Sequence, residues 1–258
     1  MATEELRLVE PPRSTPAGAG VDWIGEGWRL FARAPLMWVI SIFVILVIAI
    51  VVGIVPLIGS LAFQVVQPVF AAGYVVACRN LETGGDFELE HLFAGFKKNF
   101  TSLLIVGLIF LAGSIALILV FLAFAGFGIV MAYMAGGVND VYPALMASGM
   151  SILLGTLVML ALLVPLLMLY WFAPALVMMH DMAPWAAMKA SFRGCLRNIV
   201  PFIVYGFIMM VLCFVALIPI GLGLLVWFPV AVSSTYAAYR SIYTEQPESA
   251  EPAIAKAA

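Results

Sequence analysis

Few residues in this chain have side chains that could take part in chemistry, and they lie far apart in the sequence. His180 and Asp181 are adjacent, and an imidazole beside a carboxylate could in principle transfer protons. Adjacent residues on a helix point in different directions, however, and no nucleophile or third partner accompanies this pair. A role in a turn or at the start of the next helix is therefore the simpler interpretation. The second histidine, His91, is remote, so a histidine-based metal cluster is not expected.

The strongest polar candidates inside an apolar segment are two glutamines. Gln64 and Gln67 are three residues apart and so share one face of a helix. They could line a pore, or they could form hydrogen bonds that hold neighbouring helices together. No ionisable residue lies in the middle of an apolar segment, which argues against a proton-coupled carrier or an ion pump.

The common motifs for phosphate binding, dinucleotide binding and hydrolysis do not occur in the sequence. Cys78, Cys195 and Cys213 are isolated thiols, and packing is a simpler interpretation for them than a disulfide or a zinc site. We therefore expect neither enzyme activity nor a bound cofactor.

The composition indicates that the chain is surrounded by lipid. Of its 258 residues, 65% are hydrophobic and only 10% are charged, whereas a soluble domain has about 45–50% and about 25%. So few charges could not cover a soluble globule of this size without large exposed apolar patches. The net charge is −2 and no long basic run occurs, which excludes a nucleic-acid partner.

Four long stretches contain no charged residue: 34–78, 99–139, 141–180 and 198–239. Each is longer than the about 20 residues that a helix needs to cross a bilayer. Glycine and proline breaks divide these stretches into six predicted spans: 36–55, 58–78, 102–124, 150–172, 199–218 and 222–239. The third and fourth stretches are longer than one crossing. Their helices are expected to be tilted, or to continue along the membrane surface.

The positions of the basic residues predict how the chain is threaded. With six spans, all 12 Lys and Arg residues fall on one side of the membrane, and the opposite loops carry only Asp140. The positive-inside rule then places both termini in the cytoplasm. Residues 1–20 and 244–258 are predicted to be disordered cytoplasmic tails around a six-span membrane domain over residues 21–243.

An amphipathic stretch precedes each pair of spans. In each stretch apolar and aromatic residues recur with a helical period beside basic residues, which in the third stretch follow one another every fourth residue. We predict helices that lie in the membrane interface and direct basic side chains toward anionic lipid phosphates. The alternative is that each stretch continues into its span, with snorkelling basic residues. The candidate lipid-contact residues are Arg29, Arg33, Lys97, Lys98, Lys189, Arg193 and Arg197.

The three stretches and their spans also indicate an internal repeat. Residues 93–99 parallel residues 192–198, and Arg79 follows Pro68 at the same distance as Arg240 follows Pro229. Each second span carries a proline, which could mark a hinge or simply shape the packing. The pattern predicts three degenerate units, each made of an interfacial helix, a span, a short turn and a proline-bearing span.

Two pieces of the chain carry a family resemblance: residues 25–31 with Pro35 and Trp38, and residues 172–240, in which residues 187–192 and the pair Arg197-Asn198 stand out. They resemble a family of uncharacterised bacterial polytopic inner-membrane proteins, which is distantly similar to the membrane domain of some glycerophosphodiester phosphodiesterases. The similarity extends over roughly residues 21–243. It implies a bacterial inner-membrane location and a polytopic helical fold. It implies no activity, because the family has no established one, and the phosphodiesterase activity is not carried over, because the sequence shows no soluble phosphodiesterase domain.

These observations together predict an all-α polytopic membrane protein with six transmembrane helices in three hairpins and cytoplasmic amphipathic helices. The expected function is that of a non-catalytic structural or regulatory membrane component that engages anionic membrane lipid or a partner protein. The alternative is a permease or channel for a neutral or amphipathic solute, with Gln64 and Gln67 on its path. A homo-oligomer also stays open.

Overall fold

The computed structural model describes residues 7–136 and 141–245, which are helical apart from connecting segments and an isolated β-bridge between Leu8 and Thr244. In chain order the elements are α1 (Ala19–Arg33), α2 (Pro35–Gly53), α3 (Ile58–Glu82), the 3-10 turn η1 (Leu89–Phe93), α4 (Ala94–Lys97), α5 (Phe100–Gly136), α6 (Val141–Tyr170), α7 (Ala173–His180), α8 (Pro184–Arg197), α9 (Ile199–Leu217) and α10 (Leu224–Tyr243).

Within the described residues, five helical segments are long and apolar enough to cross a membrane. They are Pro35–Gly53, Ile58–Glu82, Phe100–Met131, Ser148–His180 and Ile199–Leu217. The fold is therefore all-α and polytopic, as predicted. The sixth predicted span, 222–239, forms α10, which is long enough but carries polar residues such as Ser233, Ser234 and Arg240. The count of six spans stays a prediction.

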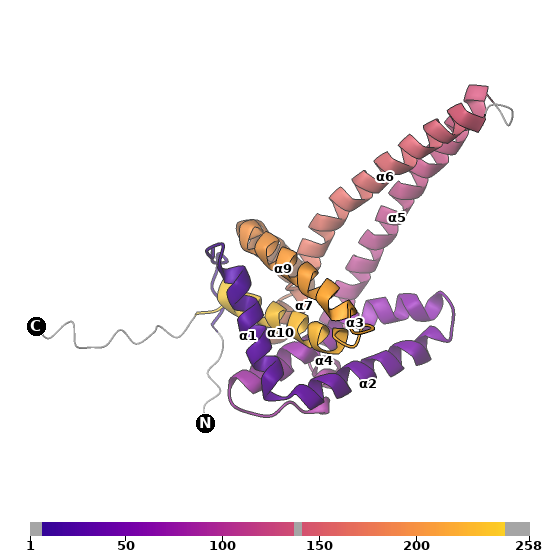
Figure 1. Cartoon of the computed structure of the whole chain (residues 1–258). Coiled ribbons are helices and arrows are strands. Elements are labelled where there is room, and N and C mark those ends of the chain that lie inside the picture. The colour runs from indigo at the N-terminus through magenta and orange to yellow at the C-terminus, as the bar shows by residue number, and fades with distance from the viewer. Residues whose placement is uncertain (1–6, 137–140, 246–258) are drawn as a thin grey trace, which may run out of the picture.

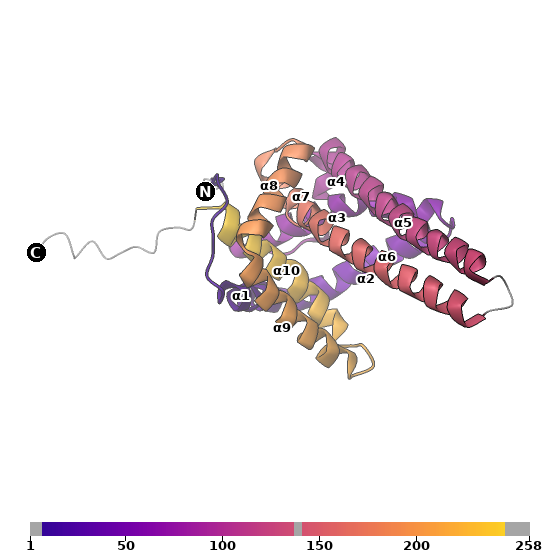
Figure 2. The ribbon, with the colours of Figure 1, turned by 90° about the horizontal axis from the view of Figure 1, so that it is seen from above.

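Three helical hairpins, α2–α3, α5–α6 and α9–α10, extend from a common base, as Figures 1 and 2 show. The base consists of residues 7–18, α1, η1, α4, α7 and α8 together with the adjoining ends of the hairpins. Every described Lys and Arg belongs to the base. The charge asymmetry of the sequence thus corresponds to one end of the molecule. The predicted outward loop around Asp140 lies outside the described residues.

Each amphipathic helix is separate from the span that follows it. Ala34 leaves the helical conformation between α1 and α2, with φ −146° and ψ 54°, and Pro35 starts the next helix. Asn99 has φ 61° before α5, and Asn198 has φ −122° and ψ 30° before α9. The amphipathic stretches are therefore distinct helical elements, and the alternative of continuous entry into the spans is not what the chain adopts.

The α5–α6 hairpin, which we name the long hairpin, is longer than the other two. α5 has 37 residues, which corresponds to about 55 Å at 1.5 Å per residue. A bilayer has a hydrocarbon core of about 30 Å, so a strong tilt or an extension beyond the core is required. In Figure 1 the long hairpin leaves the base at an angle to α2 and α3.

The amphipathic helix of each unit packs against the second helix of another unit's hairpin. η1 and α4 contact α3, α8 contacts α6 and α7, and α1 contacts α10. The contacts are close. A Cβ atom on Gly73 of α3 would stand 2.3 Å from the Leu92 carbonyl oxygen, and one on Gly95 of α4 would stand 2.5 Å from that of Val69. Each unit therefore contacts the next one, and the first contacts the third, so that the three units form a closed ring at the base.

α1 closes this ring by hydrogen bonds to α10. The Ser233 hydroxyl donates to the Gly27 carbonyl oxygen at 2.9 Å, and the Trp23 indole donates to the Ser241 hydroxyl at 2.8 Å. Gly27 permits this approach, because a Cβ there would stand 2.7 Å from the backbone nitrogen of Ser234. The first and last units of the chain are thus joined directly.

The fourth predicted span bends between α6 and α7, two residues before Pro174, because proline cannot donate to the carbonyl one turn earlier. The hydroxyl of Ser191 in α8 bonds to the two backbone groups that lack a helical partner at this bend. It accepts a hydrogen bond from the Phe172 N–H at 2.9 Å and donates to the Met168 carbonyl oxygen at 2.6 Å. A neighbouring helix thereby satisfies the backbone groups at the bend.

The structure differs from the expectation of a disordered tail over residues 7–18. The amide of Asn198 donates to the Arg13 carbonyl oxygen at 2.9 Å, and its oxygen accepts from the Thr15 N–H at 2.8 Å. The Val9 N–H donates to the Tyr243 carbonyl oxygen at 2.8 Å. The prolines that lower helix propensity here let the segment run extended along α8 and α10. Residues 1–6 and 246–258 of the two predicted tails lie outside the described residues.

Candidate functional site

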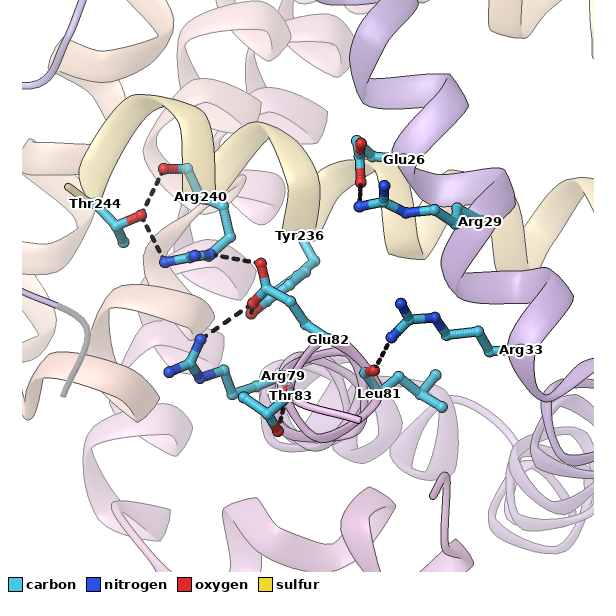
Figure 3. Close-up of polar contacts among 10 residues, drawn as sticks. All are labelled: Glu26, Arg29, Arg33, Arg79, Leu81, Glu82, Thr83, Tyr236, Arg240 and Thr244. Carbon is cyan, nitrogen blue, oxygen red and sulfur yellow. Dashed lines mark hydrogen bonds and ion pairs between the residues drawn. The ribbon is translucent and has the colours of Figure 1, made fainter. Parts of the chain in front are cut away.

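The candidate site is a charged cluster in the base where α3 and α10 meet. The Glu82 carboxylate accepts hydrogen bonds from Arg240 Nε at 3.0 Å, Arg79 Nη1 at 3.2 Å and the Tyr236 hydroxyl at 2.6 Å (Figure 3). Arg240 also donates to the Thr244 hydroxyl at 2.9 Å. Two guanidinium groups thus share one carboxylate, which leaves the cluster with an excess of positive charge.

The sequence places these groups by its repeat. Arg79 and Arg240 occupy equivalent positions relative to Pro68 and Pro229, and the structure brings both to Glu82. Glu82 lies one helical turn after Arg79, so the two face each other on α3. The equivalent arginines of two units therefore meet at a carboxylate of one of them.

α1 contributes a second row of charges to the same region. Arg33 donates to the Leu81 carbonyl oxygen, and Arg29 forms an ion pair with Glu26. Figure 3 shows Glu26, Arg29 and Arg33 on α1 near Glu82 and Arg240. Residues of α1, α3 and α10 line a cavity of about 630 Å³, here named the α1–α10 cavity, and residues 13–16 form another part of its wall.

Three tyrosines on α10 connect the units of the ring. Tyr236 donates to Glu82 of α3, the Tyr239 hydroxyl lies 2.6 Å from His180 Nε2 of α7, and Tyr243 donates to the Ala190 carbonyl oxygen of α8 at 3.0 Å. The rings of Tyr239 and Tyr243 stack with their centroids 6.0 Å apart. One face of α10 thus holds an end of each of the three units.

The neighbouring residues His180 and Asp181 point to different partners. Asp181 accepts from the Asn99 amide at 2.7 Å and pairs with Lys98 at 3.1 Å. The hydrogen bond from Asn99 and the charge of Lys98 lower the pKa of the Asp181 carboxyl. His180 contacts Tyr239 instead. The pair therefore joins helices at a turn, which agrees with the simpler interpretation of the sequence.

All seven basic residues predicted to contact lipid are exposed at the base. Most of them also have a protein partner. Lys97 pairs with Glu90, whose carboxyl pKa is lowered by the hydrogen bond from that ammonium group. Arg197 donates to the Pro12 carbonyl oxygen at 2.8 Å. Lys98, Arg29 and Arg33 are engaged as described above.

α8 is different, because its basic side chains have no carboxylate partner among the described residues. Lys189 and Arg193 are exposed beside Trp185 and Leu196, which are 53% and 46% exposed. The Lys189 ammonium lies 6.0 Å from the Trp185 ring. The opposite side of α8 packs into the base, where burial raises the pKa of the Cys195 thiol to about 12. α8 therefore presents a stripe of apolar, aromatic and basic side chains.

The two glutamines do not form a common polar surface. The Gln64 amide donates to the Ser114 hydroxyl of α5 at 3.3 Å, whereas Gln67 is exposed on α3. Gln64 thus makes the interhelical hydrogen bond that was one of the two alternatives. The α1–α10 cavity includes neither residue. Among the described residues no three His, Cys, Asp or Glu side chains are placed to hold a metal ion.

Sequence reasoning missed Glu82, Tyr236 and Asn198 as parts of the base. A signal was present for Glu82, because it is a carboxylate one turn from a repeat-equivalent arginine. Asn198 was also visible as the counterpart of Asn99 in the parallel segments. The partners of both residues come from distant parts of the chain, so the sequence did not indicate them.

The fold and the base together define the class: a polytopic helical membrane protein with a charged, hydrogen-bonded base. A curated protein of Burkholderia thailandensis named as a probable inner membrane protein is 31% identical over 238 residues, which are 90% of this chain and 84% of that relative. No protein-family model matches the chain, and no solved structure matches it. The chain belongs to the family of this relative, and it is an integral protein of the inner membrane.

Proposed function

We propose that this chain is a non-catalytic structural or regulatory component of the bacterial inner membrane, with its base on the cytoplasmic side and anionic phospholipid bound along the base. The observation that carries the proposal is the exposed stripe of α8. Lys189 and Arg193 lie there beside Trp185 without a carboxylate partner among the described residues. Basic side chains next to interfacial tryptophan are the usual contacts of anionic headgroups.

The other two units supply similar neighbours around the base. Trp28 is 54% exposed beside Arg29, and Phe96 is 40% exposed beside Lys97. An aromatic ring and a basic residue therefore recur on the amphipathic helix of each unit. This arrangement suits a ring of lipid headgroups at one level of the bilayer.

The polar contacts of the base and the wider family resemblance both support a component without catalytic activity. The polar side chains of the base are engaged in hydrogen bonds and ion pairs between helices, which is a structural use of them. The resemblance to the membrane domain of glycerophosphodiester phosphodiesterases supports a membrane component without chemistry of its own. The permease alternative gains no support from Gln64, which is bonded to Ser114, or from the exposed Gln67.

The test compares lipid selectivity of the full-length protein reconstituted in phosphatidylcholine vesicles. The fraction of spin-labelled phosphatidylglycerol immobilised at the protein, relative to spin-labelled phosphatidylcholine, is measured by electron paramagnetic resonance. The variant Lys189→Gln/Arg193→Gln should lose much of the preference for phosphatidylglycerol, since each basic residue near the surface contributes about 1 kcal/mol.

The matched control is Lys97→Gln/Lys98→Gln, which removes the same charge. Both of these ammonium groups are paired with carboxylates, so the control should reduce the preference less. An unchanged preference in the α8 variant would contradict the proposal. Orientation is tested separately with reporter fusions after Glu245 and within residues 137–140, which should report opposite sides.

A further inference from the structure

The α1–α10 cavity is a different surface from the α8 stripe, and none of its lining residues belongs to α8. Its volume of about 630 Å³ falls within the about 300–1,000 Å³ that small-molecule sites occupy. Trp23, Leu30 and Ala237 give it apolar wall surface. A concave site with apolar walls and converging polar groups is the usual form of a ligand site.

The lining of the cavity carries an excess of positive charge. Four guanidinium groups face three carboxylates, so one net positive charge remains with every group ionised. The guanidinium groups are those of Arg13, Arg29, Arg33 and Arg240, and the carboxylates are those of Asp22, Glu26 and Glu82. A ligand that carries a single negative charge would balance this lining.

The arginines retain hydrogen-bond donors for such a ligand. A guanidinium group has five N–H donors. Arg33 uses one nitrogen for the Leu81 carbonyl oxygen, and Arg240 uses Nε for Glu82 and Nη1 for Thr244. The contacts to Leu81 and Glu82 also hold the two guanidinium groups in place. Fixed guanidinium groups with free donors suit the oxygens of a phosphate group, which they bind with charge-assisted hydrogen bonds.

We infer that the α1–α10 cavity binds a phosphodiester group through Arg29, Arg33 and Arg240. The group belongs either to the headgroup of an anionic phospholipid or to a soluble phosphodiester. In its lipid form the inference rests on the proposed function, because it places one lipid at a defined position of the same base. Asp22 lies on the lining as a carboxylate that opposes the anion.

The experiment uses the full-length protein in a neutral detergent with phosphatidylglycerol as the probe. Native mass spectrometry gives the affinity of the first lipid that binds. Arg29→Gln/Arg33→Gln should weaken the first phosphatidylglycerol at least about tenfold, since it removes two charge-assisted contacts. Both side chains are exposed, and an unchanged melting temperature verifies the fold.

Asp22→Asn is a second variant, chosen because its expected effect is tighter binding, which misfolding would not produce. It removes a negative charge from the lining, so it should tighten the binding of the first phosphatidylglycerol. The control Lys189→Gln/Arg193→Gln should leave this first affinity within about twofold, because both residues lie outside the cavity. Glycerophosphoglycerol, which is the headgroup without acyl chains, is added as a competitor. Displacement of the lipid assigns the site to the phosphodiester itself, and no displacement assigns it to the lipid.

Equal first affinities for the wild type and for Arg29→Gln/Arg33→Gln would overturn the inference. The proposed function fails in a different way, by an unchanged lipid preference of the α8 variant in the spin-label experiment. Loss of preference in the α8 variant with no effect of the cavity variants leaves the proposed function and removes the cavity site. The reverse pair of results removes the proposed function and keeps a phosphodiester site.

Discussion

The base and the outer part of the long hairpin are both rich in apolar residues, but they are held together in different ways. In the base, Trp38, Tyr239 and Phe172 are fully buried, and serine, asparagine and tyrosine side chains bond one unit to another. Toward the far end of the long hairpin, Phe127 and Ile129 are each more than 60% exposed. Its two helices contact each other more than any other pair of elements in the described residues, and they also contact α3, α4, α7 and α8.

The difference shows which forces specify the fold of a membrane protein. Apolar side chains of the long hairpin that are exposed to lipid pay no free-energy cost there. Burying them against protein would therefore bring little hydrophobic gain. Close approach at small residues and hydrogen bonds between helices are left as the specific interactions. In the base they join different units, as at Gly73 and Ser191, whereas in the outer part of the long hairpin they join only α5 to α6, as at Gly128. We therefore expect substitutions at the helix contacts of the base to be costly, and matched substitutions at positions of the long hairpin outside its own helix contacts to be mild.

The largest contrast should come from a single added methyl group. Gly73→Ala places a Cβ 2.3 Å from the Leu92 carbonyl oxygen, and backbone must move to relieve the clash. The free energy of unfolding should fall by about 3 kcal/mol, the upper part of the range for overpacking. Gly126→Ala in the long hairpin meets nothing within 4 Å, and it should be neutral or stabilising by up to about 1 kcal/mol. Detergent-induced unfolding measures both, and equal effects would remove the proposed contrast.

A smaller contrast should come from removing a hydroxyl group. Ser191→Ala leaves the Phe172 N–H and the Met168 carbonyl oxygen without their partner at the bend, which should cost about 2 kcal/mol. The control is Thr156→Ala in the long hairpin, whose hydroxyl donates to the Ile152 carbonyl oxygen of its own helix. The control should change the unfolding free energy by less than about 0.5 kcal/mol. A control as costly as Ser191→Ala would argue against the base as the specific part.

The smallest effect depends on pH and concerns the exposed Asp181. Its pKa is lowered in the fold by Asn99 and then Lys98, so its ionised form stabilises the protein at pH values above the ordinary carboxyl pKa of about 3.9. This stabilisation is lost as the pH falls through the lowered pKa. Asn99→Gly keeps the positive φ but removes the amide, which bonds to Asp181 and also to the Val177 carbonyl oxygen. The loss of the Val177 contact should lower the melting temperature at every pH, and the loss of the Asp181 contact should make the decrease larger at pH 7 than in acid below the lowered pKa.

The matched control for this pH effect is Asn80→Gly, which removes an amide bonded to the Asp86 backbone carbonyl rather than to a carboxylate. Its effect on the melting temperature should be the same at both pH values. A difference between Asn99→Gly and the wild type that does not shrink in acid would contradict the assignment of Asp181 as the titrating group.

The fold could be predicted in outline because apolar length and charge position are local properties. The spans ended within a few residues of the observed helices at 36–55, 58–78 and 199–218. The prediction was less complete for the long hairpin, since uniform apolar composition does not mark where α5 ends. It differed from the structure at residues 7–18, because the partners of that segment are α8 and the end of α10.

The sequence by itself determined that the chain is a membrane protein, that its basic residues lie at one end of it, and that three similar units follow one another. Only the tertiary structure decided that these units close into a ring and that Arg79 and Arg240 meet at Glu82. The reason is physical. The preference of a side chain for lipid or water depends on that residue alone. A hydrogen bond or a glycine contact between helices depends on two residues, and the sequence does not state how far apart they lie in space.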